Sequence, residues 1–155
     1  MEPEKLMPGM VVQFGSIELV FLAKMRLKSG LSYLFDNGYT FYGSDLNRLT
    51  ENADRYGHFF VSDDAMEVLE NHNLVIKEVS QLRPGMVILT IEDNYGLCDI
   101  RNVAVVDSIH GMAFDRHGEI IKFSGNYVVN TGYEVPVDGL LTEEGRVAIE
   151  KMYPE

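Results

Sequence analysis

Apolar and polar residues alternate most regularly along residues 17–28. Every second residue of that segment is apolar, namely Ile17, Leu19, Phe21, Ala23, Met25 and Leu27. A period of two is typical of a β-strand with one face on a core and the other face toward solvent. The pattern therefore predicts one long, half-buried strand in the first half of the chain.

A turn signal follows this strand. Asp36, Asn37 and Gly38 stand between the apolar runs 31–35 and 39–42, and Asn-Gly between two such runs predicts a type I′ β-hairpin. The second half repeats the Asp and the Gly at residues 115–118, with one more residue between them. We therefore expect the second hairpin to be one residue longer than the first.

Two short helices are expected, one near the end of each half. Ser62 and Thr142 are good N-cap residues, and two acidic residues follow each of them, where the helix dipole favours negative charge. The first half has a further helical candidate at residues 45–55, capped by Ser44. The corresponding part of the second half, residues 126–136, reads as extended chain.

Two parts of the chain resemble each other. Residues 6–12 and 82–88 are identical at five of seven positions, at an offset of 76. Further matches keep the same order at offsets of 79 and 80: Phe35-Asp36 with Phe114-Asp115, and residues 61–65 with residues 141–145. Ordered matches of this kind predict a tandem duplication. We expect one unit at residues 1–78, carrying the extra segment 45–55, and a second at residues 79–155.

These elements together predict a mainly β protein of the β-rich α+β class, built from two tandem pseudo-repeats. Each repeat is expected to form a small bent sheet or an SH3-like barrel with a short C-terminal helix. The pattern L-x-P-G-M-V, which begins at Leu6 and at Leu82, resembles the opening of SH3-like and translation-type β-barrels. That resemblance implies the barrel alternative.

Composition places the chain among folded globular proteins, with 46% hydrophobic and 24% charged residues. The longest apolar runs are far shorter than a membrane span, and the acidic residues 1–4 do not suggest a secretory signal. Cys98 is the one cysteine, and the sequence has no N-x-S/T sequon. Both features fit a reducing compartment, so we expect a cytoplasmic protein.

The formal net charge of −11 narrows the choice of partners. The acidic excess is spread over both halves, and such a field repels double-stranded nucleic acid and anionic membranes. It favours a protein partner with a basic surface, although solubility alone also explains mild acidity.

Candidate binding residues fall in the first repeat. Lys24, Arg26 and Lys28 would lie on one side of the expected strand, and a row of cations suits a phosphate group. The alternative is that the three side chains are solvated or paired with acidic residues. Tyrosine supplies rigid contact area with a polar tip. The full candidate set for a ligand or partner is Lys24, Arg26, Lys28, Tyr33, Tyr42, Arg48, Arg55 and Tyr56.

Residues suited to metal binding or catalysis are present without a recognisable motif. The second hairpin region contains Asp107, His110, Asp115, His117 and Glu119. Their spacing matches no metal site, and a hairpin tip is polar because it is wet. No nucleophile or phosphate-loop signature occurs, and a lone cysteine is more often a buried apolar residue. We expect no metal, no cofactor and no catalytic residue.

The function expected from the sequence is therefore binding: a non-enzymatic, acidic protein-interaction module that acts as an inhibitor or adaptor. By association alone, such small acidic proteins are frequent among phage-type host-interaction factors. One alternative is a small-molecule binder that holds a phosphorylated ligand, such as a nucleotide, in a cleft between repeats or subunits. A second alternative is a hydrolase with an unrecognised site. Because β units can pair through exposed edges, we also expect a homodimer.

Overall fold

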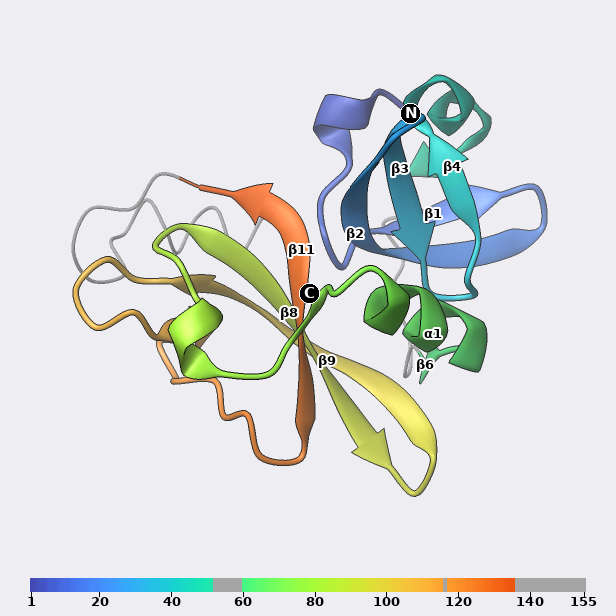
Figure 1. Cartoon of the computed structure of the whole chain (residues 1–155). Helices are drawn as coiled ribbons and strands as arrows, with labels where there is room; N and C mark the ends of the chain where they lie inside the picture. Colours follow the sequence, from blue (N-terminus) through green and yellow to red (C-terminus); the bar gives the residue numbers. More distant parts are fainter. Residues whose placement is uncertain (52–59, 116, 136–155) are drawn as a thin grey trace.

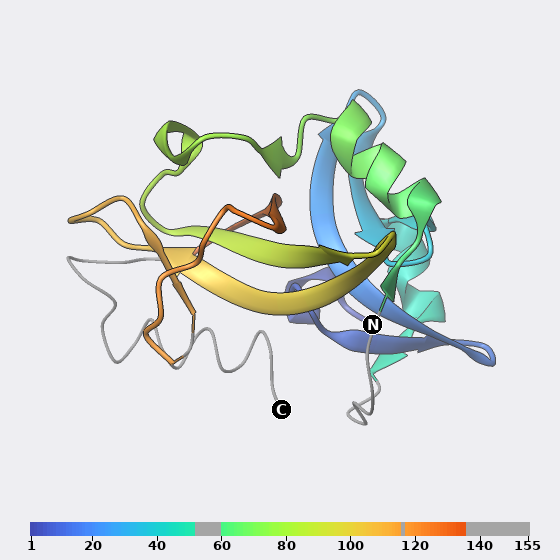
Figure 2. The same cartoon turned by 90° about the horizontal axis from the view of Figure 1, so that it is seen from below.

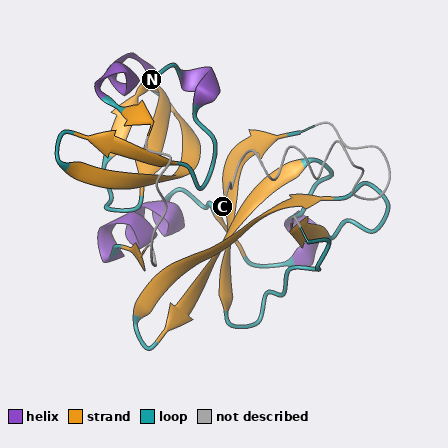
Figure 3. Cartoon of the chain, turned by 180° about the vertical axis from the view of Figure 1, so that it is seen from behind, coloured by secondary structure: helices purple, strands orange, loops and turns teal. Residues whose placement is uncertain are grey.

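The computed structural model describes residues 1–51, 60–115 and 117–135. Strands dominate it, and they form two antiparallel sheets that pack against each other (Figure 1, Figure 3). The expected β-rich class is confirmed.

The first sheet is an antiparallel meander with one added strand. Its strand order is β4-β3-β2-β1-β5. The strands are β1 (Val11–Phe14), β2 (Ile17–Leu27), β3 (Gly30–Phe35), β4 (Thr40–Tyr42) and β5 (Thr50–Glu51). Two 3-10 helices accompany it, η1 (Pro3–Lys5) and η2 (Gly43–Arg48).

The second sheet follows the short connecting elements in the middle of the chain. These are β6 (Phe60–Val61), α1 (Asp63–Asn71), β7 (Val75–Ile76) and η3 (Val79–Gln81). The long strands are β8 (Met86–Asn94), β9 (Leu97–Val106), β10 (Ala113–Asp115) and β11 (Asn126–Glu134). The strand order is β10-β9-β8-β11-β7. Strand β6 pairs with the beginning of β9, at Cys98 and Asp99.

The two sheets share a relative strand order. Consecutive strands form a meander in each, β1 to β4 in the first sheet and β8 to β10 in the second. A later strand adds beside the first strand of the meander: β5 pairs with β1, and β11 pairs with β8. Neither sheet closes among the described residues: the edge strands β4 and β5 of the first sheet are not paired with each other, and neither are β10 and β7 of the second. A barrel requires that closing ladder, so the barrel alternative is wrong and the bent sheet is what forms.

Three groups of buried side chains fill the molecule. One lies within the first half, around Phe21, Phe35 and Leu46, and one lies within the second half, around Ile88 and Val106. The third is the largest and joins the halves, because it takes residues from β1, β2, β3, α1, β8, β9 and β11. Each sheet thus buries one face in its own core and the other face against its partner. Figure 2 shows α1 and the two sheets lying next to one another.

Strand β2 departs from the expected half-buried strand. All five residues from Leu19 to Ala23 are buried. Leu19 and Phe21 belong to the core of the first half, whereas Ala23 and Met25 belong to the shared core. The register shift between Phe21 and Ala23 explains the change, because a bulge turns the following side chains to the other face.

The expected type I′ turn at residues 36–38 is also wrong. Gly38 has φ +91°, but Asn37 does not have positive φ, and a type I′ turn requires positive φ at both central residues. Gly38 N–H donates to Phe35 O (3.0 Å) and Phe35 N–H donates to Tyr39 O (2.9 Å), as in a type I turn followed by a glycine bulge.

The second hairpin turn has the same length as the first. Gly118 N–H donates to Asp115 O and Asp115 N–H donates to Glu119 O, both at 2.9 Å. This pattern matches that of Phe35, Gly38 and Tyr39 one for one. The extra residue expected from the sequence is therefore wrong: in hydrogen bonding, Asp115 takes the place of Phe35 and not that of Asp36.

The helix expectations have mixed outcomes. Helix α1 is confirmed, with the Ser62 hydroxyl accepting from Ala65 N–H (3.1 Å). The helix expected over residues 45–55 is wrong for residues 45–51, because η2 ends at Arg48 and β5 follows it; residues 52–55 lie outside the described part of the chain. Leu46 and Leu49 are both buried. Strand β11 confirms the extended segment up to residue 134. The Thr142 helix lies outside the described residues.

Gly132 lies at a close approach of the two halves and gives a stability prediction. Its φ is +81°, and an added Cβ would lie 2.4 Å from the Lys24 carbonyl oxygen of β2. Gly132→Ala should therefore lower the free energy of unfolding by about 2–4 kcal/mol, since it combines backbone strain with a backbone clash. Urea denaturation measures this change.

The matched control is Gly125→Ala. Gly125 has φ +79°, yet nothing lies within 4 Å of an added Cβ. The Gly125→Ala substitution should lower the free energy of unfolding only through backbone strain at positive φ, by about 1 kcal/mol. Equal losses in the two variants would contradict a close contact between the halves.

Candidate functional site

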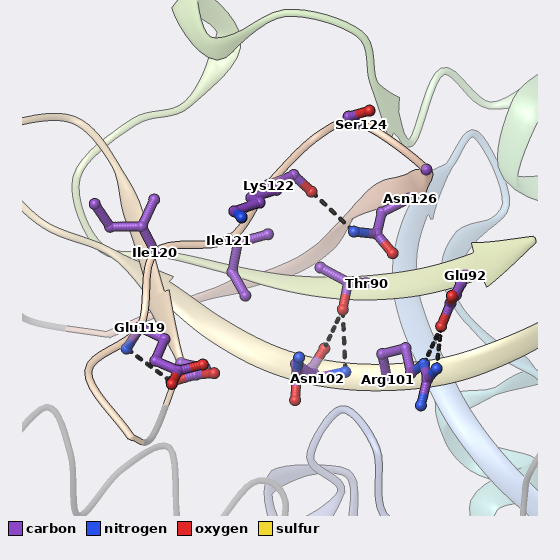
Figure 4. A pocket seen from close by; sticks show the side chains of 12 residues that line it. Thr90, Glu92, Arg101, Asn102, Glu119, Ile120, Ile121, Lys122, Ser124 and Asn126 are labelled. Atoms are coloured by element: carbon purple, nitrogen blue, oxygen red, sulfur yellow. Dashed lines mark hydrogen bonds and ion pairs between the residues drawn. The ribbon is translucent and has the colours of Figure 1, made fainter.

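A hollow of about 470 Å³ lies on the second sheet. Strands β8 and β9 form its floor, and the segment before β11 forms its wall (Figure 4). On the floor, the backbone N–H of Asn102 donates to Thr90 Oγ1 (3.0 Å), and Arg101 pairs with Glu92. Both contacts join β8 to β9 and so stabilise the sheet.

A second hollow, of about 340 Å³, lies between the halves. We call it the inter-sheet pocket; Lys24 and Arg26 of β2 line it, with His72 from the end of α1 and Asn130 and Gly132 of β11. Its apolar lining is Met25, Leu27, Leu31 and Leu74. The charged side chains in this lining, Lys24 and Arg26, are both cationic, in a chain of net charge −11.

Local structure explains why these elements meet at the inter-sheet pocket. Helix α1 ends at Asn71 with His72 as its C-cap, and Asn73 adopts φ +55°, so that Leu74 N–H donates to Leu69 O (2.9 Å). Leu74 O then accepts from Asn130 N–H (2.8 Å), which ties the helix end to β11. On the other wall, Lys24 Nζ lies 4.1 Å from the centre of the Tyr133 ring, a cation–π contact that fixes the ammonium.

Tyr133 itself belongs to β11 but packs into the first half. Its ring lies 5.8 Å from that of Phe21, edge to face. Burial, and then the neighbouring Tyr33, raise the pKa of the Tyr133 hydroxyl far above its usual range. The phenol therefore stays neutral and serves as packing between the halves.

A third region lies where the β8–β9 hairpin passes α1 (Figure 1). Two adjoining hollows, of about 350 and 390 Å³, share Asp63, Gly96 and Cys98. The first is rimmed by carboxylates over an apolar floor; its lining is Asp63, Met66, Glu67, Glu70, Asp93, Gly96, Cys98 and Tyr127. The second has a more apolar lining that includes Val61 and Leu97.

The end of this hairpin carries an exposed aromatic ring. Tyr95 is fully exposed and Leu97 is 59% exposed. Both Tyr95 and Gly96 have positive φ, 54° and 87°, so this two-residue turn has the type I′ geometry, and Asp93 Oδ1 accepts from Gly96 N–H (3.1 Å). This turn carries no recognisable sequence signal, because Asn-Tyr-Gly lacks the usual Asn-Gly pair.

The candidate residues from the sequence are brought together only in part. Lys24 and Arg26 share the inter-sheet pocket, and Tyr33 is buried opposite Lys24 in the sheet. Lys28, Tyr42 and Arg48 are exposed and line none of the hollows described above. Arg55 and Tyr56 lie outside the described residues.

The histidines and acids near the second hairpin are held by the backbone. Asp107 accepts from His110 N–H and Met112 N–H, both at 2.9 Å. Burial alone would raise the pKa of Asp107, but these hydrogen bonds and the nearby His110 imidazole outweigh it and lower the pKa. Asp115 organises a separate turn. Within the described ranges no three His, Cys, Asp or Glu side chains gather as a metal site.

Cys98 is a half-buried free thiol beside the acidic hollow. Burial, followed by the charges of Asp93 and Asp63, raises its pKa above the usual value. The thiol form is therefore favoured, and a nucleophilic thiolate is disfavoured.

Comparison with known proteins found no matching family model, no similar curated protein and no similar solved structure. No helix in the described part of the chain is both long and apolar enough to cross a membrane.

Asp36 links the first hairpin to the start of α1 and gives a pH prediction. Its Oδ1 accepts from Val20 N–H (2.9 Å), and its carbonyl oxygen accepts from Ser62 N–H (2.8 Å). Burial raises the pKa of its carboxyl from 3.8 to about 6, against the opposing effect of the Val20 hydrogen bond. The folded protein thus binds this proton more tightly than the unfolded chain does, and stability is lost as the pH rises from about 4 to above 6.

Asp36→Asn should remove this loss, because an amide oxygen can still accept from Val20 N–H. We expect the variant to be more stable than the natural protein at pH 7.5 by about 1–2 kcal/mol, and equally stable near pH 4. Urea denaturation across that pH range measures the difference. Asp45→Asn removes the same charge from η2 and serves as control; an equal gain in both variants would attribute the effect to net charge alone.

Proposed function

We propose that the protein is a non-enzymatic binding module, an inhibitor or adaptor that docks a basic protein partner on the surface where the β8–β9 hairpin passes α1. The observation that carries this proposal is Tyr95, a fully exposed aromatic side chain at the tip of the hairpin. Aromatic residues of this kind dominate the energy of many protein interfaces.

Tyr95 is unfavourable for the isolated fold in two respects. Its ring is left in water, and its backbone adopts φ 54°, a region that favours Gly, Asn or Asp over Tyr. A residue that costs stability both ways is best explained by a role outside folding. Leu97, 59% exposed on the same turn, extends the apolar surface.

The surroundings of the hairpin tip select the chemistry of the partner. The adjoining hollow combines the carboxylates of Asp63, Glu67 and Asp93 with an apolar floor that includes Met66 and Tyr127. Lysine and arginine side chains suit such a surface, because their aliphatic stems cover apolar atoms while the charged ends meet carboxylates. The overall charge of −11 would also attract a basic partner from a distance.

The tandem origin of the halves is part of this proposal. It is supported by the shared strand order and by matching turns: Gly9 and Gly85 have φ 84° and 85°, and Met10 and Met86 donate to Met7 O and Arg83 O, each at 3.0 Å. On this view β1, with four residues, is the counterpart of β8, whose nine residues carry the hairpin out to Tyr95. A cytoplasmic location and a homodimer remain predictions.

Tyr95→Asn tests the docking surface. Asn tolerates positive φ, so the variant should fold at least as stably as the natural protein. A pull-down from the native host would first identify the partner by mass spectrometry. Partner affinity should then fall by about tenfold or more in Tyr95→Asn, in keeping with the loss of an aromatic hot spot.

Tyr42→Asn is the matched control, because Tyr42 is an exposed tyrosine on the first sheet. It should leave partner affinity within about twofold. Association with the natural protein should also slow as salt is raised, because charge steering is screened beyond about 8 Å at physiological ionic strength. The proposal fails if Tyr42→Asn weakens the complex as much as Tyr95→Asn does, or if association is indifferent to salt.

A further inference from the structure

The inter-sheet pocket concentrates positive charge in an acidic protein. Lys24, Arg26 and His72 line it, and no carboxylate does. Within the described residues, neither Arg26 nor His72 forms an ion pair with an acidic side chain. Arg101 and Lys77, by contrast, each pair with a glutamate. The pocket therefore leaves cationic groups uncompensated beside apolar walls.

Several groups around the pocket are held in place before any ligand arrives. The contact of Lys24 Nζ with the Tyr133 ring fixes the ammonium. Asn130 Oδ1 accepts from Gly132 N–H (3.0 Å), which orients the amide so that its NH₂ group stays available as a donor in this part of the structure. The close backbone approach of Gly132 to Lys24 makes the junction of the two walls rigid. Preorganised donors of this kind bind with a smaller loss of entropy.

From this geometry we infer that the inter-sheet pocket binds the phosphate group of a small phosphate monoester. The Arg26 guanidinium can engage two phosphate oxygens at once, and Lys24 supplies a point charge. The Leu31 and Leu74 side chains offer apolar surface to the organic part. A volume of about 340 Å³ falls in the range of small-molecule sites.

This inference is independent of the proposed docking surface. The pocket and the hollow of the docking surface share no lining residue: the pocket takes Lys24 and Arg26 of β2, whereas the hollow takes Asp93 and Gly96 of the β8–β9 hairpin. Either site can fail without the other. Tyr95→Asn should leave ligand binding unchanged, and Arg26→Gln should leave partner binding unchanged.

Calorimetric titration tests the pocket with adenosine 5′-monophosphate, glucose 6-phosphate and their unphosphorylated parents, adenosine and glucose. At least one monoester should bind, and neither parent should. Arg26→Gln should weaken the binding about tenfold or more, because a charge-assisted, two-pronged contact is lost. Arg26 is exposed, so the variant should keep the natural melting temperature.

Arg48→Gln is the matched control, because it removes the same charge from an exposed position on η2. It should change the affinity by less than about twofold. The inference is overturned if Arg48→Gln weakens binding as much as Arg26→Gln does. It is also overturned if a parent compound binds as tightly as its ester, or if neither ester binds with a dissociation constant below about 10 mM. Binding of inorganic phosphate without either ester would overturn it as well.

Discussion

The shared apolar layer between the two sheets is the interaction on which the rest of the molecule depends. Val20 and Leu22 of β2 meet Val87 and Leu89 of β8 in one buried cluster, with Leu69 of α1 closing it. Each sheet has apolar residues on both faces, and a sheet exposed on one such face would be unstable in water. The two halves therefore stabilise each other by removing these faces from solvent.

This layer also sets the positions of the surfaces proposed for binding. To cover the shared core, β11 runs close against β2, and Gly132 permits the approach. The inter-sheet pocket is the gap left at the edge of that contact, where the side chains are too polar to be buried. On the far side, β8 and β9 extend past α1 and place Tyr95 at their end. Packing thus explains where both surfaces lie, while exposure and charge indicate what they bind.

The sequence predicted the local elements better than the way they pack. The β-rich class, α1 with its Ser62 cap and the extended segment of β11 all follow from periodicity and capping, which are local properties. The bulge between Phe21 and Ala23 left no signal, because alternating apolar residues continue through it. The helix at residues 45–55 failed for a similar reason: the spacing of Leu46 and Leu49 suits either a 3-10 turn or an α-helix.

The candidate site could be predicted only in fragments. The spacing on one strand predicts a cationic row of Lys24, Arg26 and Lys28, and the pocket takes only the first two. His72 and Asn130 join them through tertiary contacts that no motif records. Tyr95 is not among the sequence candidates, because neither its exposure nor its positive φ can be inferred before the hairpin is formed. Sequence patterns identify residues that are near one another along the chain, whereas these sites combine residues that are distant along it.

Native-state hydrogen exchange in Leu22→Ala tests most directly whether the two halves form one cooperative unit through the shared layer. Leu22 is fully buried in that layer, so its truncation should cost about 2–5 kcal/mol. If the account is correct, the slowest-exchanging amides of β8 and β9 in the second sheet lose as much protection as those of β2 and β3 in the first. Amides of β8 and β9 that keep their full protection while β2 and β3 become labile would contradict it.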